Sequence, residues 1–319
     1  MLHEFAVSPD IFLASAFDVK TDLGEFIPAE THGHLALTSL LKGIERFGVI
    51  RNLSGGMWWG VLDGREDGLH PRSREVLKKL KSNGRVVHAP ARMAGSPAAE
   101  KEWLAEAVAS HGAEPKITQF FGTDEFCASL NAADHKNLPA GISKIPYCLP
   151  FSGGGCSIKV KRDIDAYIEV LRPLIKYSRS LMFIDPYLDL AAPNYKDFVT
   201  LLETIAAINP DAEVELHRQI KPAPREPMRT ASDWKQSFHQ VIAANAALNK
   251  LSISVFVWDE FHDRYLVSNL MGISVPYGFD TTSKDEATRW SMLSTQDAND
   301  VREEFTEGDP HDRRKLQRT

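Results

Sequence analysis

The sequence has few cysteines and no long hydrophobic run. Its three cysteines, Cys127, Cys148 and Cys156, are odd in number and contain no CxxC pair, which indicates a reduced protein without disulfides or a zinc knuckle. No stretch approaches the roughly 20 apolar residues that a membrane-spanning helix needs. The first 20 residues contain acidic side chains and lack the basic start of a signal peptide. We therefore expect a cytoplasmic protein with no membrane partner.

Positive charge is also in deficit. The chain has 37 Lys and Arg against 43 Asp and Glu, a net charge of −6, which argues against a surface that is basic all over. A local basic groove remains compatible with this total, because the net charge of a chain hides local fields. The apolar content of 43% and the charged content of 25% are typical of a soluble globular protein. A length of 319 residues favours two domains.

A glycine-rich segment, PFSGGGCSIKVKRD at residues 150–163, separates the two halves. Three consecutive glycines are costly in backbone entropy inside a helix or strand, so a linker is the natural interpretation. A phosphate-cradling loop is the alternative, although the GKS/T ending of such loops is missing. The sequence predicts an α/β domain over residues 1–150, a second domain over 151–300 and a charged, flexible tail over 301–319.

Helical and strand-like patterns alternate through both halves. In the first half, residues 34–48 have helical spacing, and residues 49–63 are predicted to form a strand, a turn and a strand. In the second half, predicted helices at 162–177, 194–209 and 232–250 alternate with apolar segments that have strand character. Such alternation predicts β-α-β units and a mainly parallel sheet. The first half gives no indication of its function.

The stretch HDRYLVSN, residues 262–269, places a histidine and an arginine two residues apart. In a strand, His262 and Arg264 would project from the same face. An arginine can hold phosphate oxygens in two parallel hydrogen bonds, and a neutral imidazole can attack phosphorus or transfer a proton. Asn269 could hold a local turn or the second ring nitrogen of the histidine. Beyond the strand, Gly278 and Asp280 lie where backbone can approach a ligand closely.

The pattern H-x-R-x4-N followed by G-F-D resembles the H-x-K-x4-D…G-S-x-N signature of the phospholipase D superfamily. His262 takes the position of the nucleophile, Arg264 that of the lysine and Asn269 that of the aspartate, while Gly278 and Asp280 fall near the G-S-x-N element. The resemblance covers roughly residues 160–296. It implies a C-terminal mixed sheet flanked by helices, after a separate N-terminal α/β region.

The motif departs from the family in three respects. Arginine replaces lysine, which retains phosphate binding but changes reach and hydration. Asparagine replaces aspartate and supplies no negative charge. Only one motif is present, whereas the family brings two histidines together, so the resemblance implies a homodimer with the site on a two-fold axis. His262 would then form a phosphohistidine, and His262 of the partner subunit would protonate the leaving oxygen, without a metal or other cofactor.

Four further residues are candidates for the same site. The resemblance places Glu286 where the family often has an acid that supports the histidine. Asp185, Tyr187 and His217 follow or end predicted strands, and the carboxyl ends of parallel strands converge. For His217, an exposed histidine among basic neighbours is the competing interpretation.

The sequence therefore favours a metal-independent phosphodiesterase. Nucleic acid, DNA or RNA, is the expected substrate, because no membrane-binding helix gives access to lipid. Single-motif members of the family with an extra domain resemble bacterial restriction or defence nucleases. One alternative is a phospholipase D-like module that binds nucleic acid but has lost catalysis. Another is a metalloenzyme in which Glu260 and His262 share a metal.

Overall fold

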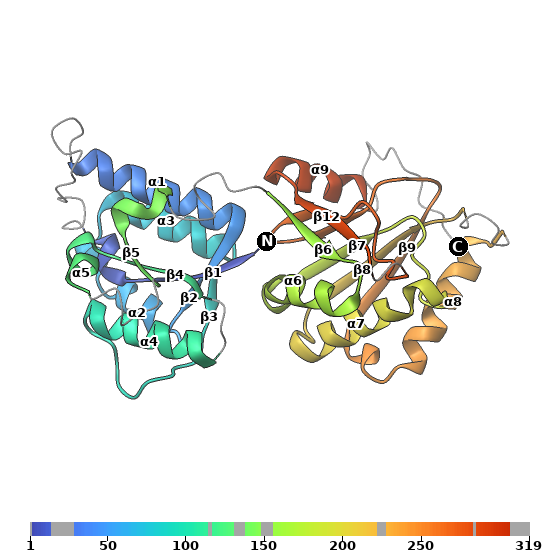
Figure 1. Ribbon diagram of the computed structural model, residues 1–319, viewed down its shortest axis with the longest axis horizontal. Coiled ribbons are helices and arrows are strands. Elements are labelled where there is room, and N and C mark those ends of the chain that lie inside the picture. The colour runs from blue at the N-terminus through green and yellow to red at the C-terminus, as the bar shows by residue number, and fades with distance from the viewer. Residues whose placement is uncertain are drawn as a thin grey trace. The chain divides into compact units, whose positions relative to one another are not determined.

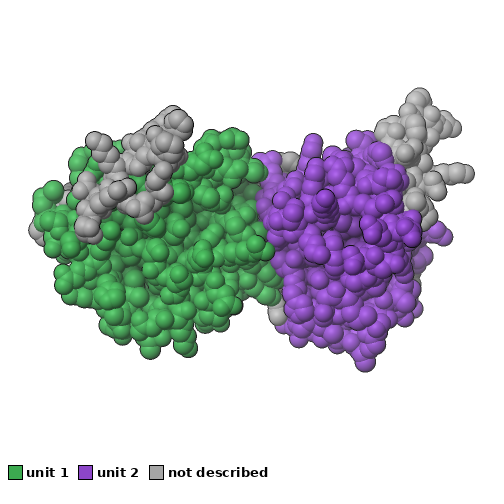
Figure 2. Space-filling model, turned by 180° about the vertical axis from the view of Figure 1, so that it is seen from behind, with its two compact units in different colours: residues 1, 155–319 green, residues 2–154 purple. Residues whose placement is uncertain are grey.

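The chain folds into two compact units, residues 2–154 and residues 155–319, which Figure 2 distinguishes by colour. The computed structural model describes residues 2–13, 29–113, 117–130, 138–147, 156–221, 228–282 and 285–306. Most of the predicted glycine-rich linker lies outside these ranges. Each unit contains one β-sheet with helices against it (Figure 1), which confirms the α/β class.

The N-terminal unit is built on a parallel sheet with strand order β3-β2-β1-β4-β5. The strands are β1 (His3–Val7), β2 (Gly48–Asn52), β3 (Val86–His88), β4 (Ile117–Gly122) and β5 (Pro139–Gly141). The helices are α1 (Ala29–Phe47), α2 (Met57–Asp63), α3 (Pro71–Ser82), α4 (Glu100–Ala113) and α5 (Asp124–Ser129), with 3₁₀ turns at Pro9–Phe12, Glu66–Gly68 and Ile142–Tyr147. Helices α1 and α3 lie together on one side of the sheet and α4 on the other (Figure 1).

One predicted strand in this unit is a helix. Residues 57–63 form α2, after a turn in which Ser54, Gly55 and Gly56 all have positive φ. Trp58 is buried, and its Nε1 donates a hydrogen bond of 2.5 Å to the Val7 carbonyl. The strand prediction for this stretch is therefore wrong. The buried residues, Trp58 and Leu62, are four positions apart, as in a helix, whereas the aromatic composition of the stretch favours a strand.

The C-terminal unit is built on a mixed sheet with strand order β6-β12-β11-β10-β7-β8-β9. Its strands are β6 (Ser157–Lys161), β7 (Ser180–Ile184), β8 (Glu213–Gln219), β9 (Ser252–Trp258), β10 (Tyr265–Ser268), β11 (Gly272–Ser274) and β12 (Ala287–Met292). Its helices are α6 (Ile164–Tyr177), α7 (Lys196–Ile208), α8 (Ala231–Ala244) and α9 (Thr295–Glu304), with 3₁₀ turns at Pro193–Tyr195 and Leu248–Lys250.

Only one end of this sheet matches the mainly parallel prediction. Strands β7, β8 and β9 are parallel, whereas β10, β11, β12 and β6 add in an antiparallel manner. Short connections explain the difference, because β10, β11 and β12 follow one another without an intervening helix, and parallel pairing needs a long crossover.

The two faces of β7 pack against different helices, as expected for side chains that alternate along a strand. Phe183 packs edge-on against Phe198 of α7, with ring centroids 5.1 Å apart. Ile184 belongs to the opposite cluster, which includes Val301 and Phe305 at the end of α9. The strand ends next to a buried acid, Asp185, which meets residues on the α7 side.

The prediction of a flexible tail over residues 301–319 is wrong for its first residues. Residues 301–304 complete α9, and the buried side chains of Val301 and Phe305 pack against the sheet. Local charge density suggested disorder, but two apolar residues four apart anchor this helix. Residues 307–319 lie outside the described ranges. No helix in the described part of the chain combines the length and apolar character needed to cross a membrane.

Candidate functional site

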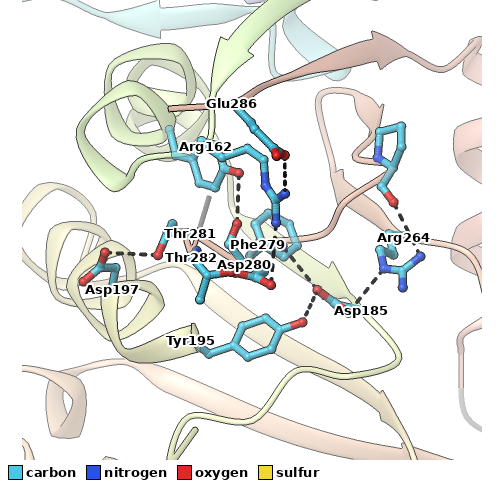
Figure 3. Close-up of polar contacts among 12 residues, drawn as sticks. Arg162, Asp185, Tyr195, Asp197, Arg264, Phe279, Asp280, Thr281, Thr282 and Glu286 are labelled. Carbon is cyan, nitrogen blue, oxygen red and sulfur yellow. Dashed lines mark hydrogen bonds and ion pairs between the residues drawn. The ribbon is translucent and has the colours of Figure 1, made fainter. Parts of the chain in front are cut away.

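A fully buried carboxylate, Asp185, organises the end of β7 (Figure 3). Its Oδ2 accepts hydrogen bonds from the Tyr195 hydroxyl at 3.0 Å and from the Phe279 N–H at 3.2 Å. Its Oδ1 accepts from the Tyr187 N–H at 3.1 Å and lies 3.7 Å from Arg264 Nε. Asp185 thus connects three segments that are far apart in the sequence.

Burial also shifts the pKa values of Asp185 and Tyr195. It raises the pKa of Asp185, an effect that the Tyr187 hydrogen bond and the charge of Arg264 oppose. Burial, followed by the neighbouring Asp185 carboxylate, raises the pKa of Tyr195 well above its ordinary value. The Tyr195 phenol therefore keeps its proton and donates a hydrogen bond to the carboxylate.

Gly278 permits the loop after β11 to approach this carboxylate. Its φ is +63°, and a Cβ at this position would lie 2.0 Å from Asp185 Oδ2 and 3.2 Å from Arg264 Cδ. Any larger residue would both strain the backbone and displace the buried acid. The sequence prediction that Gly278 allows close approach fits this position, although the group it approaches is Asp185.

Arg264 is held from several sides but retains an unused donor. Its Nη1 donates to the carbonyls of His262 at 3.2 Å and Pro276 at 3.5 Å, and its guanidinium lies 5.5 Å from the centre of the Tyr187 ring. The side chain is 25% exposed. Its Nη2 makes no hydrogen bond with any residue in the described ranges. The arrangement presents a fixed cation that can bind an oxyanion.

A second arginine, Arg162, lies beside the same loop (Figure 3). It is almost fully buried, with Nη1 3.2 Å from Glu286 Oε2 and Nη2 3.6 Å from Asp280 Oδ2. The Asp280 carboxylate also accepts hydrogen bonds from the Thr282 hydroxyl and N–H at 2.6 and 2.7 Å. Sequence reasoning missed Arg162 and Tyr195. The only signal for Arg162 was a basic residue between the end of a strand and the Asp163 helix cap.

His262 is not part of a strand. Strand β10 begins at Tyr265, and both His262 and Arg264 precede it. The expectation that these two residues share a strand face is therefore wrong. The His262 side chain is 77% exposed, and its Nε2 lies 3.8 Å from Glu260 Oε1. That carboxylate also pairs with Lys221 at 2.5 Å. Among the described residues, no three His, Cys, Asp or Glu side chains gather as a metal-binding group.

Asn269 and Glu286 lie away from His262. Asn269 follows β10 at the end opposite to Arg264, and its Oδ1 accepts hydrogen bonds from the N–H groups of Arg179 at 2.7 Å and Ser180 at 3.4 Å. Because β10 runs antiparallel to β7, this is the start of β7, not its site end. The structure therefore places Asn269 away from His262, and its side chain holds the start of β7 instead of a local turn. Glu286 contacts Arg162 instead of the histidine.

His217 is a core residue. It is paired in register with Ile184 and therefore faces the α9 side of the sheet, away from the Asp185 carboxylate. Its side chain is completely buried, with Nδ1 accepting from Trp258 Nε1 at 3.0 Å and Nε2 3.1 Å from Glu215 Oε2. Both predictions, a cleft-lining and an exposed histidine, are wrong, because register decides the face and sequence does not show register.

We expect the unfolding free energy to fall as the pH drops below about 6.5, because burial lowers the pKa of His217 from 6.5. The unfolded histidine then takes up a proton that the folded one resists, with a limiting slope of about 1.4 kcal/mol per pH unit. His3 in the other unit, with a pKa of about 4, acts in the same direction. Denaturant titrations should therefore compare wild type with His217→Gln, whose slope should flatten, and with exposed His239→Gln, whose slope should not change. An unaltered slope for His217→Gln would contradict this assignment.

Comparison with known proteins adds little to this geometry. No family model and no curated protein matches the chain. Among solved structures, the chain is similar to one titled "Structure of TrmBL2, an archaeal chromatin protein, shows a novel mode of DNA binding", at 12% identity over 73% of this chain and 78% of that one. The TM-score of 0.28 is too low to carry an argument about fold or function.

Proposed function

We propose that the C-terminal unit is a phosphodiesterase that cleaves nucleic acid without a metal, through His262 and Arg264. The observation that carries the proposal is the fixed Arg264 guanidinium. It is held by the buried Asp185 and the carbonyls of His262 and Pro276, while Nη2 has no hydrogen-bond partner in the described residues. A preorganised cation next to a histidine suits charge stabilisation during phosphoryl transfer.

The chemistry divides into two displacements. Arg264 binds a non-bridging oxygen, and a ring nitrogen of His262 attacks phosphorus, so that an N–P bond forms as the P–O bond to the leaving group breaks. His262 of the partner subunit protonates the leaving oxygen, then takes a proton from water as that water attacks phosphorus and the N–P bond breaks. The high exposure of His262 allows it to meet its symmetry mate across a two-fold axis. Such a pair needs one neutral and one protonated imidazole.

DNA or RNA is the proposed substrate because each contains phosphodiesters, whose non-bridging oxygens Arg264 can bind. Phosphate contacts position a strand without reading its sequence, so the proposal carries no sequence preference. A role in bacterial defence follows from the family resemblance alone and stays a prediction.

The second candidate is a binding module that has lost catalysis. The observation in its favour is the surroundings of His262. Within the described residues, its ring has one charged neighbour, Glu260 at 3.8 Å, and Lys221 already engages that acid. Arg264 would still bind phosphate in such a module, because its position depends on Asp185 and not on the histidine ring.

The test is cleavage of labelled single- and double-stranded DNA and RNA in EDTA by wild type, Arg264→Gln and Arg264→Lys. We expect wild-type cleavage, a loss of about 10²–10³-fold in Arg264→Gln and partial recovery in Arg264→Lys, which keeps the charge but lacks the fork. The exposed Arg289→Gln in the same unit is the control. Binding without wild-type cleavage would favour the binding module. Cleavage that requires an added divalent metal would reject the phosphohistidine mechanism.

A further inference from the structure

Helix α3 of the N-terminal unit concentrates positive charge in an acidic chain. Among residues 71–82, five are Lys or Arg and one is Glu, whereas the whole chain has a net charge of −6. The helix is amphipathic, with Val76, Leu77 and Leu80 buried in the core of the unit. The cations lie on the remaining, solvent-facing surface.

Some cations of α3 are paired with an acid of the same helix, and others are not. The single acid, Glu75, pairs with Arg72 at 2.5 Å and with Lys79 at 2.9 Å. Arg74 and Lys78 are exposed, and their side chains make no ion pair or hydrogen bond with residues in the described ranges. Since they are four residues apart, they are neighbours on the helix surface, where like charges repel each other and destabilise the helix. A polyanion would turn this repulsion into attraction.

A further cation extends the surface around this pair. Lys81 lies three residues beyond Lys78, and its Nζ sits 4.2 Å above the Trp59 ring. We call this group, Arg74, Lys78 and Lys81, the α3 basic face.

The composition of the α3 basic face fits a phosphate backbone better than a bilayer. A helix that lies in a membrane interface needs large apolar side chains at the surface next to its cations. None of the large apolar residues of α3 is exposed, because they are all used in the core. Lys and Arg on a helix that exposes no large apolar residue are a usual means by which proteins bind nucleic acid independently of sequence.

We propose that the α3 basic face is a docking surface for the backbone of nucleic acid, which gives the N-terminal unit a function in holding the substrate. The link to cleavage rests on the function proposed for the C-terminal unit, whereas docking does not depend on that function.

The test measures binding of the full chain to labelled duplex DNA in EDTA across salt concentrations of about 50–200 mM. A His262→Ala background keeps the DNA intact. Arg74→Gln/Lys78→Gln is compared with Lys101→Gln/Lys250→Gln, which removes the same charge from exposed positions on other elements. Glutamine retains helix propensity at all of these sites except Lys250, which lies in a 3₁₀ turn.

We expect the α3 variant to bind DNA roughly tenfold more weakly than its parent. The plot of log affinity against log salt should become less steep by about 1.8, which is about 0.9 for each phosphate that the variant no longer neutralises. The control should keep the parental slope. Equal slopes for the two variants would overturn the proposal. Binding to phosphatidylcholine–phosphatidylserine vesicles is measured in parallel. An α3 variant that keeps DNA binding but loses vesicle binding would also overturn the proposal. Failure of the proposed function would show separately, as absence of cleavage by wild type, and would leave the slope comparison valid.

Discussion

Replacing His262 with alanine is expected to lower cleavage of nucleic acid by about 10⁴-fold or more, while binding changes by no more than a few-fold. Loss of the nucleophile removes the covalent step, whereas phosphate binding by Arg264 remains. Because the His262 side chain is 77% exposed, the substitution should leave the stability of the unit within about 0.5 kcal/mol. Turnover and binding should be measured on the same labelled strand, in EDTA.

The matched control is His239→Ala, which removes another exposed histidine of the same unit, from α8. It should retain wild-type turnover. Dimers that contain one wild-type and one His262→Ala chain test the two-fold arrangement, since they have a nucleophile but lack the second histidine. Their turnover should be far below half that of wild type. Turnover of half the wild-type value would place a complete site in each chain and contradict the shared one.

Replacing Gly278 with alanine is expected to destabilise the C-terminal unit by about 3 kcal/mol and to reduce phosphate binding. The new Cβ would meet Asp185 Oδ2 at 2.0 Å, so the buried carboxylate must move. Its movement would break the hydrogen bonds from Tyr195 and Phe279 and release Arg264 from its fixed orientation. Denaturant unfolding gives the loss of stability, and amide exchange in β7 and β10 would locate it.

Gly84→Ala separates backbone strain from the clash. Gly84 has φ +67°, close to that of Gly278, but a Cβ there meets nothing within 4 Å. We expect a cost of about 1 kcal/mol from the left-handed backbone alone. If both alanine variants lose the same stability, Asp185 does not constrain the loop, and the explanation given for Gly278 is wrong.

Part of the site was readable from the sequence because its signals are local. Arg264 follows His262 by two residues, and Gly278 lies in a loop between predicted strands, so both were candidates before the fold was known. Asp185 was found from its place after a buried strand, but as a substrate contact. Its complete burial makes it a positioning residue that holds Arg264.

The residues that were assigned wrongly depend on pairing. Asn269 is seven positions from His262 in the sequence, yet it lies at the opposite end of an antiparallel strand. The end of a predicted strand places His217 near Asp185, but its register with Ile184 turns it to the other face. Tyr195 and Arg162 reach the site from a 3₁₀ turn and from a residue just after a strand, and no periodic pattern marks such positions.

By itself, the sequence determined the α/β class, most helices and strands, and the histidine and arginine on which the proposed chemistry depends. These follow from hydrophobic periodicity and capping, which act over a few residues. Only the tertiary structure decided that the C-terminal sheet is mixed, that Asp185 and Gly278 fix Arg264, and that His217 belongs to the core. Those outcomes depend on strand order, register and burial, which are set by contacts between segments that lie tens of residues apart in the chain.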